Sequence, residues 1–77
     1  MMISAYVFLK FGAGAPVEII SDIRKIPGVK QSHVVTGPDD IIAFVEAENM
    51  EGIEKIILEM RKVAVVSNSD TRITWSL

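Results

Sequence analysis

The chain has 77 residues, no cysteine and one histidine, and its formal net charge at pH 7 is −2. This length allows one domain, and the composition excludes disulfides, cysteine-based metal sites and sites built from several histidines. The negative charge argues against direct nucleic-acid binding through phosphate neutralisation. Because 49% of the residues are hydrophobic, the chain is too apolar for a disordered segment and is expected to associate with further copies.

The N-terminal segment carries no targeting signal. Residues 1–4 lack the basic region of a signal peptide, and the apolar run 5–9 is shorter than a signal sequence or a membrane span requires.

Throughout the chain, no activated nucleophile and no acid–base pair stands out. We therefore expect a cytoplasmic protein that has no membrane contact, no cofactor, no metal and no catalytic residues, and that is not an enzyme.

The first half of the chain predicts a strand, a helix and a second strand. Residues 3–10 are rich in β-branched and aromatic side chains, which is typical of a strand. Pro16 is suited to the first position of a helix, and apolar residues at helical spacing continue as far as Ile26. Pro27-Gly28 ends this helix, and a strand is expected over 29–36.

The second half predicts the same unit again. Residues 37–40 form a turn in this interpretation, and residues 41–48 form the third strand. Asn49 is suited to the N-cap of a helix whose apolar stripe extends to Val63. Residues 71–77 are predicted to be the last strand, which leaves the polar run before them as a loop.

An internal repeat supports this division into two units. Ile23–Ile26 matches Met60–Val63 at an offset of 37 residues, and Ile3–Val7 matches Ile41–Val45 at an offset of 38. The order of elements predicts an α+β, ferredoxin-like βαββαβ fold. Right-handed crossovers place the first and third strands at the centre of an antiparallel four-stranded sheet, with both helices on one face.

The two central strands carry apolar side chains on both faces. One set, which includes Val7 and Val45, can face the helices. If the other face were exposed to water, apolar and polar residues should alternate along each strand, and in these two strands they do not. A second copy is expected to cover the other face in a two-fold dimer, as in dimeric α+β barrels. The alternative is a monomer with an apolar sheet surface. The predicted dimer interface consists of Tyr6, Phe8, Ile42 and Phe44.

Two other groups of residues suggest chemistry more weakly. His33, Tyr6 and Trp75 would suit a small oxygenase, but His33 has no acidic partner nearby in the sequence. The basic pairs Arg24-Lys25 and Arg61-Lys62 stand at predicted helix C-termini, where cations complement the helix dipole. We interpret both groups as structural.

Three motifs together resemble the effector domain of the Lrp/AsnC transcriptional regulators, known as the RAM domain. Pro27-Gly28-Val29 precedes the second strand, Thr36-Gly37-Pro38-Asp39-Asp40 leads into the third, and Val66-Ser67-Asn68-Ser69-Asp70-Thr71 leads into the fourth. Asp39 replaces the family's usual turn tyrosine. The resemblance covers essentially the whole chain and includes no helix-turn-helix DNA-binding domain. It implies one ligand-binding and oligomerisation domain over residues 1–77.

The resemblance also implies a function. A non-enzymatic, amino-acid-sensing module related to transcription regulation would form homodimers that join into an octamer or a decamer. A small amino-acid effector would bind between dimers, and mixed oligomers would modulate full-length Lrp/AsnC regulators. A turn carboxylate would bind the effector's ammonium group, and backbone N–H groups and hydroxyls would bind its carboxylate. The implied ligand-binding residues are Thr36, Gly37, Pro38, Asp39, Asp40, Ser67, Ser69 and Thr71.

Two alternatives stay open at this point. One is a small, monooxygenase-like enzyme of the dimeric α+β barrel type, with a cavity between helices and sheet around His33, Tyr6 or Trp75. The other is an ACT-type regulatory domain, which has the same order of elements but binds its effector near the first strand–helix loop, here residues 12–16.

Overall fold

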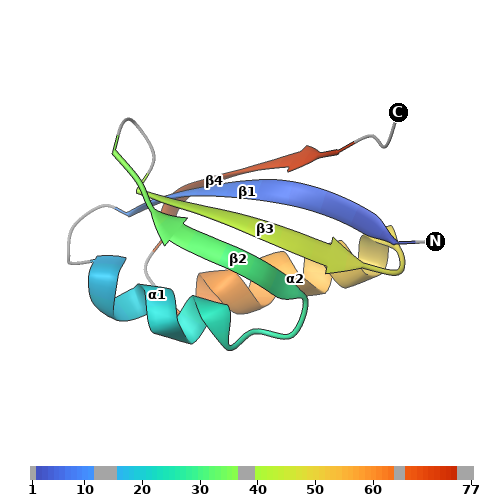
Figure 1. The fold of residues 1–77 in the computed structure, drawn as a ribbon, viewed down its shortest axis with the longest axis horizontal. Coiled ribbons are helices and arrows are strands. Elements are labelled where there is room, and N and C mark those ends of the chain that lie inside the picture. Colours follow the sequence, from blue (N-terminus) through green and yellow to red (C-terminus); the bar gives the residue numbers. More distant parts are fainter. Residues whose placement is uncertain (1, 12–15, 37–39, 64–65, 75–77) are drawn as a thin grey trace.

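The structure is a computed structural model that describes residues 2–11, 16–36, 40–63 and 66–74. Its elements follow the predicted order βαββαβ, with the same strand–helix–strand unit in each half (Figure 1). They are β1 (Ile3–Phe11), α1 (Pro16–Arg24), β2 (Val29–Val34), β3 (Ile41–Ala47), α2 (Met50–Val63) and β4 (Val66–Ile73).

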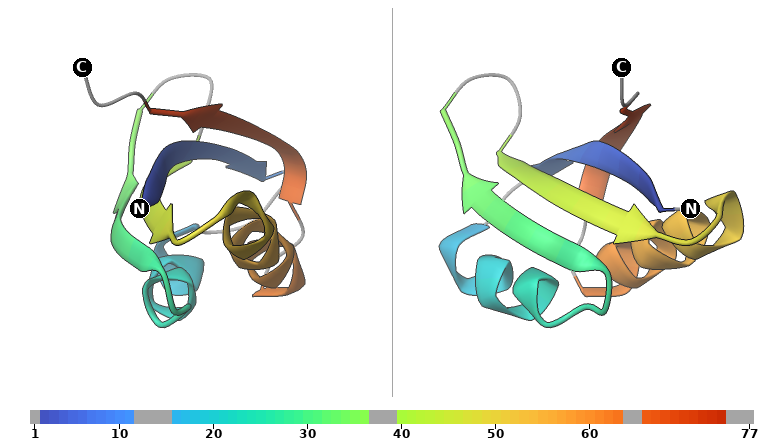
Figure 2. Two further views of the ribbon diagram at one scale, coloured as in Figure 1. Left: turned by 90° about the vertical axis from the view of Figure 1, so that its right-hand side faces the viewer. Right: turned by 45° about the vertical axis from the view of Figure 1, so that its right-hand side comes forward.

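The four strands form one antiparallel sheet in the order β2-β3-β1-β4. Both helices lie against the same face of this sheet, and no described helix covers the opposite face (Figures 1 and 2). The predicted arrangement is therefore confirmed, with β1 and β3 at the centre, β2 and β4 at the edges, and an α+β architecture of two layers.

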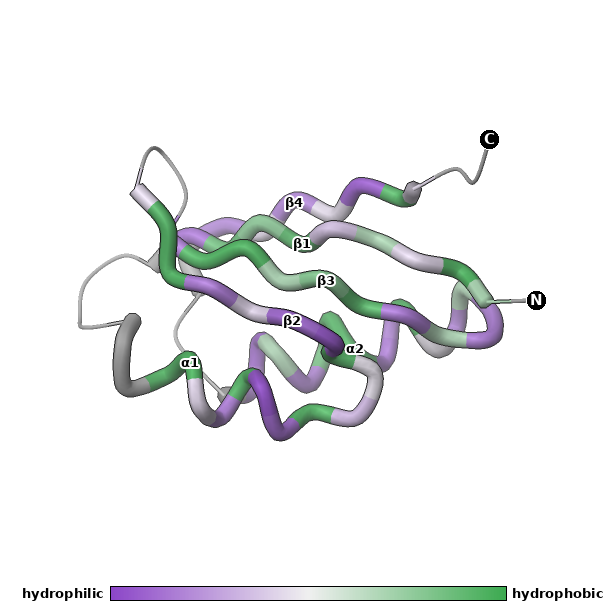
Figure 3. Tube along the Cα trace, in the orientation of Figure 1, coloured by the Kyte–Doolittle hydropathy of each residue, from purple (hydrophilic) through white to green (hydrophobic). Residues whose placement is uncertain are grey.

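The core lies between the sheet and the two helices. Alternate residues of β1 and β3 face the helices, and they are apolar; most are fully buried, whereas Ile3 and Ala47 at the strand ends are partly buried. Hydrophobic residues dominate β3, whereas the edge strand β2 is mostly hydrophilic (Figure 3). The side chains with no exposed surface are Ala5, Val7, Leu9, Ile23, Ile41, Ala43, Val45, Ile53 and Met60.

The start of β4 differs from the prediction. This strand begins at Val66 rather than Thr71, and its polar segment pairs with β1, so that Ser69 stands opposite Leu9. Because hydrogen bonding to a central strand outweighs the weak strand preference of Ser, Asn and Asp, the expected loop is part of the sheet. The prediction of a loop before Thr71 is therefore wrong, and residues 75–77 lie outside the described residues.

Shorter differences concern element ends. Helix α1 ends at Arg24 instead of Ile26, and β2 ends at Val34 instead of Thr36. Strands β1 and β3 end one residue from their predicted ends at 10 and 48. Differences of one or two residues are common at the ends of elements, and the predicted start signals of both helices are confirmed. The N–H of Gly52 donates to Oδ1 of Asn49 at 2.9 Å, which makes Asn49 the N-cap of α2.

The connection from α1 to β2 depends on Gly28. Its φ of 97° is a conformation that L-residues rarely adopt. Its carbonyl oxygen accepts a hydrogen bond from the N–H of Glu46 at 2.9 Å, which joins the connection to β3. An added Cβ would overlap Cδ1 of Ile56 and would lie 3.1 Å from the Glu46 carbonyl oxygen. Close approach and backbone conformation therefore both require glycine here.

Replacing Gly28 with Ala should lower the free energy of unfolding by about 2–5 kcal/mol, because the unfavourable φ and the overlap with Ile56 add. Urea denaturation measures this change. The exposed Glu54 on α2 offers a control, since Glu54→Ala should change the stability by less than about 0.5 kcal/mol. A Gly28→Ala loss no larger than that of the control would contradict the requirement for glycine.

Candidate functional site

Two described residues of the predicted ligand site, Asp40 and Ser69, lie at one end of the sheet, on either side of β1. The N–H of Asp40 donates to the carbonyl oxygen of Leu9 at 2.9 Å, and Ser69 of β4 stands opposite the same leucine. The two segments are therefore about two strand spacings apart, roughly 10 Å. Gly37, Pro38 and Asp39 lie outside the described residues.

Backbone hydrogen bonds hold Asp40 at the entrance to β3. Its carbonyl oxygen accepts a hydrogen bond from the N–H of Val35 at 2.9 Å, in addition to its own N–H bond to Leu9. Asp40 is half-buried and Thr36 is exposed. Because both bonds use main-chain atoms, the fold presents a carboxylate at this position independently of what the side chain contacts.

On β4, Ser69 and Thr71 belong to the helix side of the sheet. They stand opposite Leu9 and Val7, which are buried beneath the helices, and both are half-buried themselves. The hydroxyl oxygen of Ser69 accepts a hydrogen bond from Nη2 of Arg61 at 2.7 Å. Ser67, the other predicted ligand-binding residue in this segment, belongs to strand β4.

Arg61 is a residue of this region that the sequence analysis missed. Its position in the last turn of α2 suggested only a favourable interaction with the helix dipole. The structure shows that α2 instead brings its guanidinium to β4, beside a predicted ligand-binding serine. A guanidinium next to a hydroxyl is a suitable partner for a carboxylate.

The four residues of the predicted dimer interface lie on the face of the sheet opposite the helices, here called the outer face. Tyr6 stands opposite Phe44, with ring centroids 5.0 Å apart, and Phe8 stands opposite Ile42. Tyr6 is 45% exposed, and the other three are half-buried. The outer face of the central strands is therefore an apolar surface in a single copy of the chain.

Charged residues of β4 border this apolar surface. The guanidinium of Arg72 lies over the ring of Phe8, 5.0 Å from its centroid. Nη2 of Arg72 is 3.0 Å from a carboxylate oxygen of Asp70, which stands opposite Phe8. The cation–π contact and the ion pair hold the Arg72 guanidinium at the border of this apolar surface.

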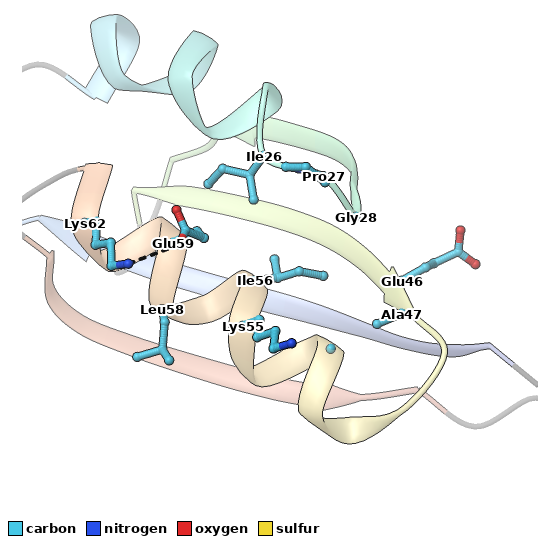
Figure 4. A pocket seen from close by; sticks show the side chains of 11 residues that line it. Ile26, Pro27, Gly28, Glu46, Ala47, Lys55, Ile56, Leu58, Glu59 and Lys62 are labelled. Atoms are coloured by element: carbon cyan, nitrogen blue, oxygen red, sulfur yellow. Dashed lines mark hydrogen bonds and ion pairs between the residues drawn. The ribbon is translucent and has the colours of Figure 1, made fainter.

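A cavity of about 570 Å³ lies elsewhere, between α2, the α1–β2 connection and the end of β3 (Figure 4). Apolar side chains such as Ile26, Ile56 and Leu58 line it, and Lys62 at its border pairs with Glu59 at 3.2 Å. None of the residues predicted to bind a ligand lines this cavity. The sequence offered one signal for it, a leucine on the polar side of α2, where Leu58 is 57% exposed.

The residues invoked for an oxygenase do not meet in that cavity. Tyr6 lies on the outer face, and neither it nor His33 lines the space between α2 and β3. Trp75 lies outside the described residues. Within the described ranges, no cluster of three His, Asp or Glu side chains is arranged to hold a metal ion.

None of the described helices is long and apolar enough to cross a membrane.

Comparison with protein families and curated proteins gives a consistent result. The family described as the Lrp/AsnC ligand binding domain matches residues 4–76. An uncharacterised helix-turn-helix-type transcriptional regulator of Pyrococcus furiosus is 32% identical over 76 residues, which cover 94% of this chain and 51% of that protein. The chain thus spans about half the length of the curated relatives that it matches.

Solved structures share the fold. A hypothetical protein from Pyrococcus horikoshii superposes with a TM-score of 0.83 and 27% identity, over 100% of this chain and 93% of its own. A feast or famine regulatory protein from Mycobacterium tuberculosis, complexed with L-methionine, has a TM-score of 0.83 and 18% identity, over 97% of this chain and 51% of its own. With a family match over nearly all of its length, the chain belongs to the Lrp/AsnC ligand-binding domain family, found in transcriptional regulators.

Proposed function

We propose that this chain is a non-enzymatic amino-acid-sensing and oligomerisation module. The observation that carries the proposal is the family match over residues 4–76, because the matching domain is the ligand-binding part of Lrp/AsnC regulators. The Mycobacterium tuberculosis protein of the same fold is complexed with L-methionine, which favours a free amino acid as the effector. The single-domain organisation over residues 1–77 and the cytoplasmic location stay predictions.

The proposed effector site is completed by a second subunit. Asp40 and Ser69 adjoin the same residue of β1, but neither lines a described cavity of the single chain. A neighbouring subunit placed against this end of the sheet would enclose them. Asp40 would then bind the ammonium group, while Ser69 and Arg61 would bind the carboxylate. The full proposed set is Thr36, Gly37, Pro38, Asp39, Asp40, Ser67, Ser69 and Thr71, with Arg61 added.

The outer face is proposed to form the dimer. Burying its apolar side chains against the same face of a second copy would gain free energy at about 25 cal/mol per Å² of apolar area removed from water. The contact is self-complementary under a two-fold axis, because each copy presents the same patch. Further association of dimers into an octamer or a decamer, and mixed assembly with full-length regulators, follow the family's expected pattern.

A thermal-shift screen against the twenty amino acids tests sensing. An effector at 100 times its Kd adds about 2.7 kcal/mol of stability, which raises the melting temperature of a chain of this size by several degrees. We expect one amino acid or a few related ones to give such a shift. Asp40→Asn, which keeps the side-chain shape and removes the charge, should abolish most of it.

Asp22→Asn provides the matched control for this screen. Asp22 is an exposed carboxylate on α1, 4.0 Å from Nζ of Lys25 and away from the β3 entrance. This variant should respond to the effector as the unmodified chain does. A full response in Asp40→Asn would contradict the site assignment, and no response to any amino acid in the unmodified chain would contradict sensing.

Ile42→Lys tests the dimer. A lysine at the centre of the outer face would place a desolvated charge in the interface, and it should weaken self-association at least about 100-fold. Analytical ultracentrifugation measures the change, with circular dichroism to show that the variant is folded. Leu58→Lys is the control, because Leu58 is also an apolar residue on the surface, 57% exposed, but lies on α2. Equal effects of both substitutions would argue against the outer face.

A further inference from the structure

A second cavity, of about 510 Å³, lies at the free edge of β2 beside the end of α1. We call it the edge cavity. Three of its six lining residues are basic and none is acidic. This composition stands out in a chain whose net charge is −2. The lining residues are Arg24, Val29, Lys30, Gln31, Ser32 and His33.

Arg24 is held in place by the backbone of β2. Its Nε and Nη2 donate hydrogen bonds to the carbonyl oxygen of Ser32 at 3.1 and 2.8 Å. The bond from the Val35 N–H to Asp40 makes Ser32 and Ala43 a non-hydrogen-bonded pair of the ladder, so this carbonyl points to the free edge of β2, where no strand bonds it. A guanidinium has five N–H donors, so the Nη1–Nη2 side of Arg24 keeps donors for other acceptors. The fork formed by these two nitrogens matches the paired oxygens of a carboxylate or a phosphate.

The positive charges of the edge cavity are not balanced by nearby carboxylates. In the described part of the chain, no carboxylate lies within 4.0 Å of the charged groups of Arg24 or Lys30. Lys25, the neighbour of Arg24, shows the contrast, since its Nζ lies 4.0 Å from a carboxylate oxygen of Asp22. Two uncompensated cations that share one cavity repel each other and attract an anion.

From these observations we propose that the edge cavity binds a small dianion, a dicarboxylate or a phosphate ester. Arg24 would hold two oxygens through its fork, and Lys30 would balance the second negative charge. The volume falls in the range typical of small-molecule sites. The edge cavity shares no residue with the proposed effector site, so the two proposals stand independently.

The test is a titration of the full chain with succinate and, separately, with inorganic phosphate, followed by ¹H–¹⁵N correlation spectra. Sodium chloride at matched ionic strength provides the reference. We expect saturable shifts of the amide signals at the end of α1 and along β2. Lys30→Gln and Arg24→Lys should each weaken binding about tenfold. Lys30→Gln removes one charged contact, and Arg24→Lys keeps the charge but removes the paired N–H donors of the guanidinium.

Lys25→Gln is the matched control, since it removes a positive charge one residue from Arg24 but outside the edge cavity. It should change the affinity less than about twofold, because an exposed charge beyond the cavity acts only through screened attraction. Saturation by succinate alone would identify a dicarboxylate site, and saturation by phosphate alone a phosphate-ester site. No saturable shift beyond the chloride reference, or an equal loss in Lys25→Gln and Lys30→Gln, would overturn the proposal.

Discussion

The pairing of β1 with a strand on each side is the constraint on which the rest of the structure depends. Leu9 illustrates it, because it stands opposite Ile41 of β3 and opposite Ser69 of β4. This register fixes which residues of all three strands face the helices. It also brings the entrance of β3 and the first half of β4 to the same end of the sheet, although Asp40 and Ser69 are far apart in the sequence.

The same register divides the apolar residues of the central strands into two surfaces with different roles. One surface packs beneath α1 and α2 and forms the core. The other, marked by the paired rings of Tyr6 and Phe44, faces away from both helices. Since a strand's side chains alternate with a period of two, neither surface can be enlarged at the expense of the other without shifting the register. The pairing register of β1 and β3 thus determines both the core of one chain and the surface proposed to associate with another.

Local signals in the sequence were sufficient to predict most of the fold. The apolar runs of β1 and β3, the cap at Asn49 and the stop at Gly28 each act over a few residues, and the structure contains all three. The start of β4 was not predictable in this way, because Ser, Asn and Asp favour loops and only the distant partner strand β1 makes them extended.

The candidate site was less accessible to prediction than the fold. The contact between Arg61 and Ser69 joins α2 to β4, and no local sequence pattern distinguishes Arg61 from a basic residue that only complements the helix dipole. The edge cavity shows the same difficulty, because the position of the Arg24 guanidinium is decided by a carbonyl of β2. The proposed completion of the effector site by another subunit is further removed still, since a contact between two copies leaves no local pattern in the sequence of one.

The hydrogen bonds from Arg24 to the Ser32 carbonyl also bear on how the chain avoids uncontrolled aggregation. An exposed edge strand is a template onto which other chains can add without limit. The guanidinium occupies an acceptor that such a strand would need, and the charged side chain of Lys30 lies on the same strand. With this edge blocked, growth of the sheet from β2 is disfavoured. Association through other surfaces, such as the apolar outer face, does not extend the sheet in this direction.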